Sequence, residues 1–342
     1  LQPLLAGLFL YGFLRFISVS KIGSFLGALV FSFSGFTIAW LEWNTIIHVM
    51  AWLPLSLLAI EKIIHIFQSL PERSSFKNKR FNCLPWVIIF TFSLISSFLA
   101  GHLQIFLYSF LVVGVYTIVK IILLKKNKFK AILLFVICYL LFILVTSIQW
   151  LPTLKFIADS ARQFDQGSFI KDGWFLPWQN LIQFIIPDFF GNPATGNYWG
   201  IWNYGEFIGY IGLLPFIFVL IGIIFVKNRK TLFWGLIGFI ALIFTLPTPL
   251  AKLIYQLQIP FISTSQPTRL MVIVDFSFSI LAALGFDWVL RNLKDRNTQK
   301  KLAGITLLFL MIFLTIWLFV LNPSWMITVL PENLLIIKRN LI

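Results

Sequence analysis

Cysteine and charged residues are scarce in this sequence. Only two cysteines, Cys83 and Cys138, occur among 342 residues, and both fall at or inside apolar runs, so no disulfide framework is available. Charged residues make up 11% of the chain, against 59% hydrophobic residues. A soluble domain with that much apolar surface would aggregate, so the composition predicts a protein that has the lipid bilayer as its solvent.

Signature motifs of common soluble enzymes are also missing. The sequence contains no Walker loop, no HExxH, no paired CxxC and no GxSxG, so ATP hydrolysis, zinc proteolysis and serine hydrolysis lack support. We assign no cofactor and no metal ligand, and leave the need for a divalent metal open. The net charge is +15, but the basic residues lie in short loops between apolar runs, so we do not expect nucleic acid as a partner.

Apolar runs long enough to cross about 30 Å of hydrocarbon recur along the chain. They are apolar all round, as helices surrounded by lipid and by one another must be, and lipid leaves such a segment no alternative to helix. We therefore predict an all-α, polytopic transmembrane helix bundle. Its ten spans are expected at residues 1–17, 21–41, 45–67, 83–100, 103–124, 130–151, 206–226, 231–247, 268–290 and 301–321.

Lys and Arg concentrate in alternate connections between these runs, for example at residues 125–130 and 227–230. An excess of Lys and Arg in short connections marks the cytoplasmic side of a membrane. We therefore place these connections in the cytoplasm, and the other connections and both chain ends outside. Because residue 1 then lies outside, a protein that starts in the cytoplasm needs an odd number of helices before it, and we interpret the chain as a fragment.

The longest connection, residues 152–205, lies on the predicted extracytoplasmic side. Its apolar stretch at 176–186 predicts a short helix on or in the membrane interface. After the last run, residues 322–342 are expected to begin an external C-terminal region. We interpret residues 1–342 as a single transmembrane domain that carries these two external parts.

Two short external turns hold polar residues that a turn does not need. In the first, Glu42 and His48 flank Asn44, and Asn44 and His48 are four residues apart, on one face of a helix. In the second, His102 and Gln104 follow a glycine. One interpretation is that these are plain turns with tryptophan anchors at the membrane interface; the other is that Glu42, His48, His102 and Gln104 line a site.

The long external connection combines charged and aromatic side chains. Among its charged residues we single out Asp159, Arg162 and Asp188, which lie near several Trp and Tyr residues. Aromatic rings beside carboxylates suit sugar binding, because rings stack on the C–H faces of a pyranose while carboxylates hold its hydroxyls. The same rings also suit an interfacial belt, and both interpretations stay open.

Arg269 stands at the outer end of the ninth run, after hydroxyl residues and an amide. An arginine there can extend to lipid headgroups, or it can bind a phosphate through two hydrogen bonds. Asp275, about two turns deeper, is an intramembrane acid that is costly unless it is paired or faces a polar cavity. We expect Asp275 to orient the site, with Arg269 or a polar group of another helix as its partner.

The chain resembles the YfhO family of bacterial membrane proteins, which belongs to the GT-C superfamily of polyprenyl-linked glycosyltransferases. The resemblance covers nearly the whole chain, although each motif is short. The motifs are residues 35–44 followed by Trp52, Leu53 and Pro54; residues 100–104; residues 149–152 followed by Ser160 and Arg162; residues 187–191; residues 206–212; and Pro267, Thr268 and Arg269 followed by residues 284–287.

The resemblance implies a GT-C-like fold in the bacterial cytoplasmic membrane. It implies sugar transfer on the extracytoplasmic face, from a lipid-linked donor, a polyprenyl-phosphate sugar, to a cell-envelope glycopolymer acceptor of the teichoic-acid type. GT-C enzymes usually carry a catalytic acid in the first external loop, so the expected acid lies upstream of residue 1. On this interpretation the fragment lacks the N-terminal helix and that loop.

Under this hypothesis Arg269 and His102 bind the phosphate, because cationic groups stabilise a leaving phosphate. Glu42, Asp159 or Asp188 then bind the sugar or the acceptor. The main alternative is a transporter or flippase of a lipid-linked glycan or an anionic solute, which would need polar sites near mid-membrane. A third alternative is a structural scaffold of an envelope assembly complex.

Overall fold

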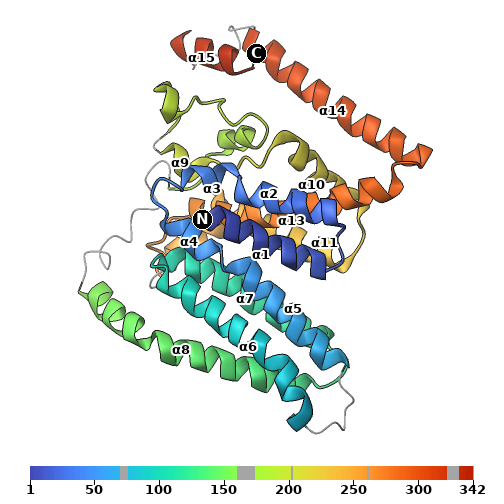
Figure 1. Cartoon of the computed structure of the whole chain (residues 1–342). Coiled ribbons are helices and arrows are strands. Elements are labelled where there is room, and N and C mark those ends of the chain that lie inside the picture. Colours follow the sequence, from blue (N-terminus) through green and yellow to red (C-terminus); the bar gives the residue numbers. More distant parts are fainter. Residues whose placement is uncertain (70–75, 160–173, 202, 260–261, 322–330, 342) are drawn as a thin grey trace. The chain divides into compact units, whose positions relative to one another are not determined.

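The computed structural model describes residues 1–69, 76–159, 174–201, 203–259, 262–321 and 331–341. Every regular element within these ranges is a helix, so the all-α prediction is confirmed for the described part of the chain (Figure 1). The chain divides into two compact units. The first contains residues 1–32, 40–168 and 254–265, and the second contains residues 33–39, 169–253 and 266–342.

The first unit is built from long apolar helices that pack side by side. Its helices are α1 (Gln2–Phe16), α2 (Lys21–Ser32), α4 (Thr45–Met50), α5 (Leu53–Ser69), α6 (Phe76–Leu99), α7 (Leu103–Leu123) and α8 (Lys128–Ala158). Helices α1 and α2 approach closely at Gly7, where an added Cβ would lie 2.4 Å from the Ser32 hydroxyl. Small residues allow this approach, which is how helices gain contact area when lipid gives no hydrophobic drive.

The second unit is organised around one central helix. It contains α3 (Gly35–Ala39), the 3₁₀ helices η3 (Trp178–Phe184) and η4 (Pro193–Thr195), α9 (Tyr204–Phe207), α10 (Leu213–Phe225), α11 (Arg229–Thr245), η5 (Pro267–Leu270), α13 (Met271–Asn292), α14 (Arg296–Leu321) and α15 (Pro331–Leu341). Helix α12 (Pro249–Gln256) extends from this unit into the first.

Helix α13 forms the core of the second unit, with most of its side chains buried between α10 and α11. Its backbone nearly touches that of α10. An added Cβ at Gly285 would lie 2.0 Å from the Phe218 carbonyl oxygen, and one at Gly222 would lie 2.8 Å from the Leu281 carbonyl oxygen. Only glycine fits at these two positions, because the obstacle is backbone rather than a movable side chain.

Fewer helices have the length and apolar composition of a membrane span than the ten predicted. Among the described residues, six helical stretches are long and apolar enough to cross a membrane, and a seventh counts if the bent pair α11 and α12 is one span. The six are Lys21–Ala39, Thr45–Ser69, Leu103–Leu123, Lys128–Ala158, Pro267–Asn292 and Arg296–Leu318. Helix α10 has 13 residues, which at 1.5 Å per residue cover only about 20 Å. Ten crossings therefore remain a prediction.

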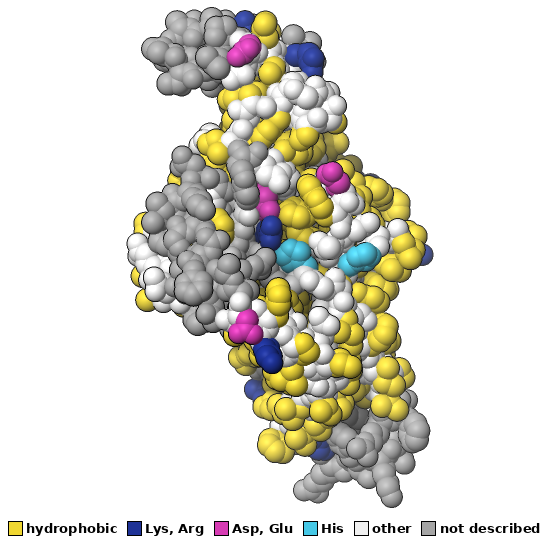
Figure 2. Space-filling view, turned by 90° about the vertical axis from the view of Figure 1, so that its left-hand side faces the viewer, with side chains coloured by type: hydrophobic (Ala, Val, Ile, Leu, Met, Phe, Trp, Pro, Cys, Tyr) yellow, Lys and Arg dark blue, Asp and Glu magenta, His cyan; other side chains and the backbone are white. Residues whose placement is uncertain are grey.

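The surfaces of the long helices fit a lipid environment. Only 28% of the span in α8 and 6% of the span in α14 are buried. Side chains such as Leu144 and Ile148 on α8 are exposed, and Figure 2 shows hydrophobic side chains spread widely over the surface. Because water would penalise this exposure, the helices are compatible with a multi-pass membrane protein.

Candidate functional site

The candidate site in the second unit begins at the short helix α9. Asn203 precedes α9, and its side-chain oxygen accepts a hydrogen bond from the Gly205 backbone N–H at 3.1 Å. An Asn in this position satisfies an N–H group that a helix start leaves without a partner. The cap fixes the turn that directs Glu206 inward, where 2% of the residue is exposed.

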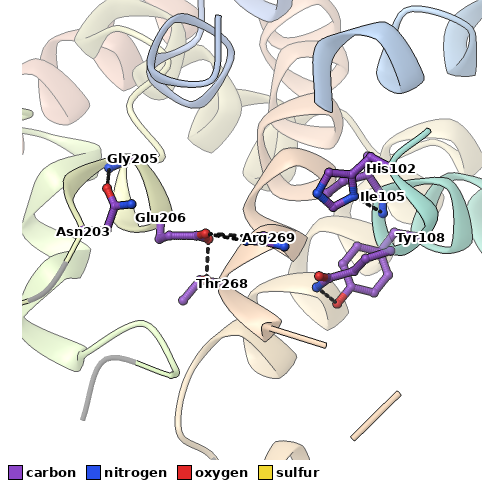
Figure 3. Close-up of polar contacts among 9 residues, drawn as sticks. His102, Ile105, Tyr108, Asn203, Gly205, Glu206, Thr268 and Arg269 are labelled. Carbon is purple, nitrogen blue, oxygen red and sulfur yellow. Dashed lines mark hydrogen bonds and ion pairs between the residues drawn. The ribbon is translucent and has the colours of Figure 1, made fainter. Parts of the chain in front are cut away.

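Two residues of η5 bind both oxygens of Glu206 (Figure 3). Arg269 donates from Nε and Nη2 to Glu206 Oε1 at 3.1 and 3.0 Å, and Thr268 donates its hydroxyl to Oε2 at 3.0 Å. Gln266 precedes η5 and Pro267 occupies its first turn, where the missing N–H of proline costs nothing. The turn that begins at Pro267 therefore presents two side chains, Thr268 and Arg269, that donate hydrogen bonds to one buried carboxylate.

The ion pair is asymmetric in its exposure to solvent. The Glu206 side chain is 2% exposed and the Arg269 side chain is 26% exposed. Charge-assisted hydrogen bonds to a buried carboxylate are strong and directional. Glu206 thus orients the guanidinium group, part of which stays accessible at the end of α13 that we predict to be extracytoplasmic.

Asp188 lies in an aromatic part of the same unit. Its carboxylate is hydrogen-bonded to the Tyr204 hydroxyl, and burial, followed by the charge of Asp188 and this hydrogen bond, raises the pKa of Tyr204 to about 12. The Tyr198 and Tyr204 rings meet edge to face with centroids 5.7 Å apart. The Asp188 carbonyl oxygen also accepts a hydrogen bond from the side chain of Asn340 in α15. Asp188 is therefore held by contacts on both its side chain and its backbone.

Both candidate residues in the turn before α7 make local hydrogen bonds. His102 caps α7, with Nδ1 accepting from the Ile105 backbone N–H at 3.4 Å, and Gln104 donates to the Tyr108 hydroxyl at 2.8 Å (Figure 3). Both side chains are half-buried. The residues that sequence analysis considered surplus to the turn thus have local roles, which leaves their part in a binding site a prediction.

The remaining candidates lie in the first unit or outside the described residues. His48 contacts the Gln2 side chain through Nε2, and Glu42 is exposed. Asp159 is exposed at the C-terminal end of α8. Arg162 lies outside the described residues. Glu42, His48, His102, Gln104 and Asp159 therefore belong to one unit, and Asp188 and Arg269 to the other.

The expected relationship between Arg269 and Asp275 takes a different form. Arg269 pairs with Glu206, whereas the polar groups beside the Asp275 carboxyl are the Ser34 hydroxyl and the Phe36 backbone N–H. Asp275 is fully buried. A polar group of another helix is the alternative partner predicted for Asp275, and Ser34 together with the first residues of α3 supplies such groups.

Glu206 is the residue that sequence reasoning missed. It directly follows the long connection at the first position of the seventh predicted run, and nothing in the local sequence links it to Arg269, which is 63 residues away. Among the described residues, no group of three or more His, Cys, Asp or Glu side chains is arranged to hold a metal ion.

The expected short helix at 176–186 coincides with η3, whose Trp178 is exposed and whose Asn180 and Gln183 are buried. Asn180 donates from its side chain to the Gln183 side-chain oxygen at 2.9 Å, so the buried amides satisfy each other.

Comparison of the chain with protein-family models, with curated proteins and with solved structures finds no match.

Proposed function

We propose that the chain belongs to a GT-C-type membrane glycosyltransferase related to the YfhO family. The enzyme moves a sugar from a polyprenyl-phosphate donor to a cell-envelope glycopolymer of the teichoic-acid type, on the extracytoplasmic face of the bacterial cytoplasmic membrane. The observation that carries the proposal is the oriented, partly exposed Arg269 at the end of a long apolar helix. A phosphate attached to a lipid tail reaches the same boundary between hydrocarbon and water.

The chemistry of glycosyl transfer fits this arrangement. When the sugar leaves a polyprenyl phosphate, negative charge develops on the phosphate, and a fixed cation stabilises that charge without reorganising. Glu206 supplies the fixation, because it holds one edge of the guanidinium group through two hydrogen bonds. The transfer also requires a carboxylate that removes the proton from the acceptor hydroxyl.

The aromatic segment of the second unit supports a role in binding the sugar or the acceptor. Asp188 and Tyr204 place a carboxylate and a hydroxyl beside each other next to the Tyr198 ring. Carboxylates that accept hydrogen bonds from sugar hydroxyls commonly stand beside such rings. Glu42, His48, His102, Gln104, Asp159 and Arg162 remain further candidates for substrate binding.

A binding measurement tests the proposal directly. The chain is reconstituted in lipid nanodiscs and titrated with farnesyl phosphate, a short polyprenyl phosphate. We expect Arg269→Gln to weaken binding about tenfold or more, because a charge-assisted pair to phosphate is lost. Arg291→Gln is the matched control, since Arg291 is 63% exposed at the other end of the same helix and pairs with Asp287 at 2.6 Å. Equal affinities in wild type and Arg269→Gln would refute the phosphate assignment.

Two observations favour a transporter or flippase as the second candidate function. Helices α11 and α12 meet at a bend of 65°, which makes them a broken span or a re-entrant loop, and Asp275 is a buried acid within an apolar helix. Broken helices and intramembrane acids are features of transporter sites. Movement of a fluorescent lipid-linked sugar across proteoliposomes, without any sugar transfer to an acceptor, would select this function.

A further inference from the structure

None of the hydrogen bonds that join Glu206 to η5 involves Asp275. Its side chain is fully buried, and within the described part of the chain neither carboxylate oxygen makes a hydrogen bond of standard geometry. Helix α13 packs against α3, and the polar groups of that segment that act on the Asp275 carboxyl are the Ser34 hydroxyl and the Phe36 backbone N–H. A buried acid is costly in an apolar helix, so its position beside two donors of another segment needs an explanation.

The two donors lie where the chain breaks between α2 and α3. Ser34 organises this break, because its hydroxyl oxygen accepts from the Thr37 backbone N–H at 3.3 Å and lies 3.1 Å from the Thr37 hydroxyl oxygen. Ser34 and Thr37 are both buried. The Asp275 carboxyl therefore faces the first residues of α3 at the point where their backbone direction is set.

Helix α3 in turn holds the segment that follows Glu206. The Gly35 backbone N–H donates to the Tyr210 carbonyl oxygen at 2.6 Å. The contact is so close that an added Cβ at Gly35 would lie 2.7 Å from the Ile208 side chain. On its other side the segment meets the start of α13, because an added Cβ at Gly209 would lie 2.5 Å from the Met271 sulfur.

These contacts form a continuous chain from Asp275 to the guanidinium group. We propose that Asp275 is a positioning residue: by attracting the Ser34 hydroxyl and the Phe36 N–H it fixes the start of α3, which holds residues 208–210 and thereby the Glu206 that orients Arg269. Asp275 itself contacts no substrate. The functional part of this inference rests on the proposed role of Arg269 in binding phosphate.

Hydrogen exchange in nanodiscs tests the structural part independently of any substrate. Asp275→Leu removes the polar atoms at similar size, and we expect the amides of residues 33–39 and 206–212 to exchange about tenfold faster or more, by local opening. Asp275→Asn keeps an oxygen facing the donors and should restore most of the protection. Ser277→Ala is the matched control, because its hydroxyl is also buried without a hydrogen bond in the described part of the chain, but it packs near Gly238 of α11.

Unchanged exchange in both segments of Asp275→Leu would overturn the proposal, as would a uniform increase over all helices. If Asp275→Leu does not accumulate, Ser34→Ala tests the same contact from α3, and the same two segments must then exchange faster. Faster exchange confined to these segments, with wild-type rates in Ser277→Ala, supports the proposal.

A double-mutant cycle tests the link to Arg269, with farnesyl phosphate affinity as the readout. Asp275→Leu should weaken binding, and adding Arg269→Gln to it should cause no further loss beyond that of Arg269→Gln alone, because both act through one group. Additive losses would show that Asp275 acts elsewhere. If Arg269→Gln leaves affinity unchanged while the exchange result holds, the proposed function fails and the positioning role of Asp275 stands.

Discussion

Arg269 donates two hydrogen bonds to a single oxygen of Glu206, at 3.1 and 3.0 Å, while Thr268 occupies the other oxygen. This arrangement gives a nearly buried carboxylate three donors and commits one edge of the guanidinium group to a fixed direction. A free arginine at the end of a membrane helix would instead move among lipid headgroups. The pair therefore converts a mobile charge into an oriented one.

Removing the charge of Glu206 should destabilise the second unit. Glu206→Gln leaves the guanidinium group without its counter-ion, and we expect a loss of about 2–3 kcal/mol in the free energy of unfolding, because a broken buried pair leaves an uncompensated charge. Denaturant unfolding in detergent measures the loss. Glu42→Gln is the control, since Glu42 is exposed and should change stability little. Equal stability of the two variants would contradict this account.

The close approach of α10 and α13 predicts a strong effect at Gly285. Gly285→Ala places a methyl group 2.0 Å from the Phe218 carbonyl oxygen, so the helices must separate, and we expect a loss of about 2–3 kcal/mol. Gly235→Ala in α11 is the matched control, because nothing lies within 4 Å of its added Cβ. There the substitution should be neutral or stabilise by up to about 1 kcal/mol. Unfolding measurements that rank the two variants in the opposite order would exclude the close packing.

A buried cluster in the first unit predicts a graded response. Tyr116 and Lys120, one turn apart on α7, both contact Oε1 of Glu61 on α5. Lys120→Met removes the positive charge that balances Glu61 in this cluster, so it should destabilise more than Tyr116→Phe, which removes one hydrogen bond to the carboxylate, worth about 1.5–3 kcal/mol, and leaves the ion pair in place. Lys126→Met, at an exposed position, is the control. A larger effect of Tyr116→Phe in denaturant unfolding would refute the ranking.

The Tyr204 hydroxyl provides a prediction for alkaline pH. Its pKa of about 12 lies above the ordinary tyrosine value of 10.0, so the folded state keeps a proton that the unfolded chain releases at lower pH. This stabilisation is fully present below pH 10 and is lost as the pH rises toward 12. The phenolate absorbance of Tyr204, obtained as the difference between wild type and Tyr204→Phe, should therefore appear near pH 12. Asp188→Asn should lower that pKa, because it removes the second-largest cause of the shift, and an unchanged or higher value would contradict the contact.

Labelling of single cysteines tests the predicted sidedness. After replacement of Cys83 and Cys138 by Ala, a membrane-impermeant maleimide added to intact cells should label Thr195→Cys and should not label Lys126→Cys. Both positions are exposed, so accessibility differs between them only through the membrane. The reverse pattern would place the lysine-rich connections outside and would remove the extracytoplasmic site.

Composition and hydropathy predict the helices because the constraint is local. A long apolar run has to satisfy its own backbone in lipid, and only a helix does so within one segment. Most of the predicted runs accordingly lie on helices of the structure, but residues 208–212 of the seventh run are not helical, and several helices are shorter than a full span. Hydropathy measures how apolar a run is and does not show where a helix breaks, so the break between α2 and α3 was not predicted, nor was the helix α12 that follows the end of the eighth run.

Local sequence is enough to show that this chain is helical and compatible with the bilayer, because hydrophobicity and charge act through neighbouring residues. It also singles out Arg269 and Asp275, since charge within or beside apolar runs is costly wherever the helix packs. Their partners follow from the packing of the helices alone. Glu206 is 63 residues from Arg269, and α3 is more than 200 residues from Asp275, so packing rather than local sequence brings these groups together.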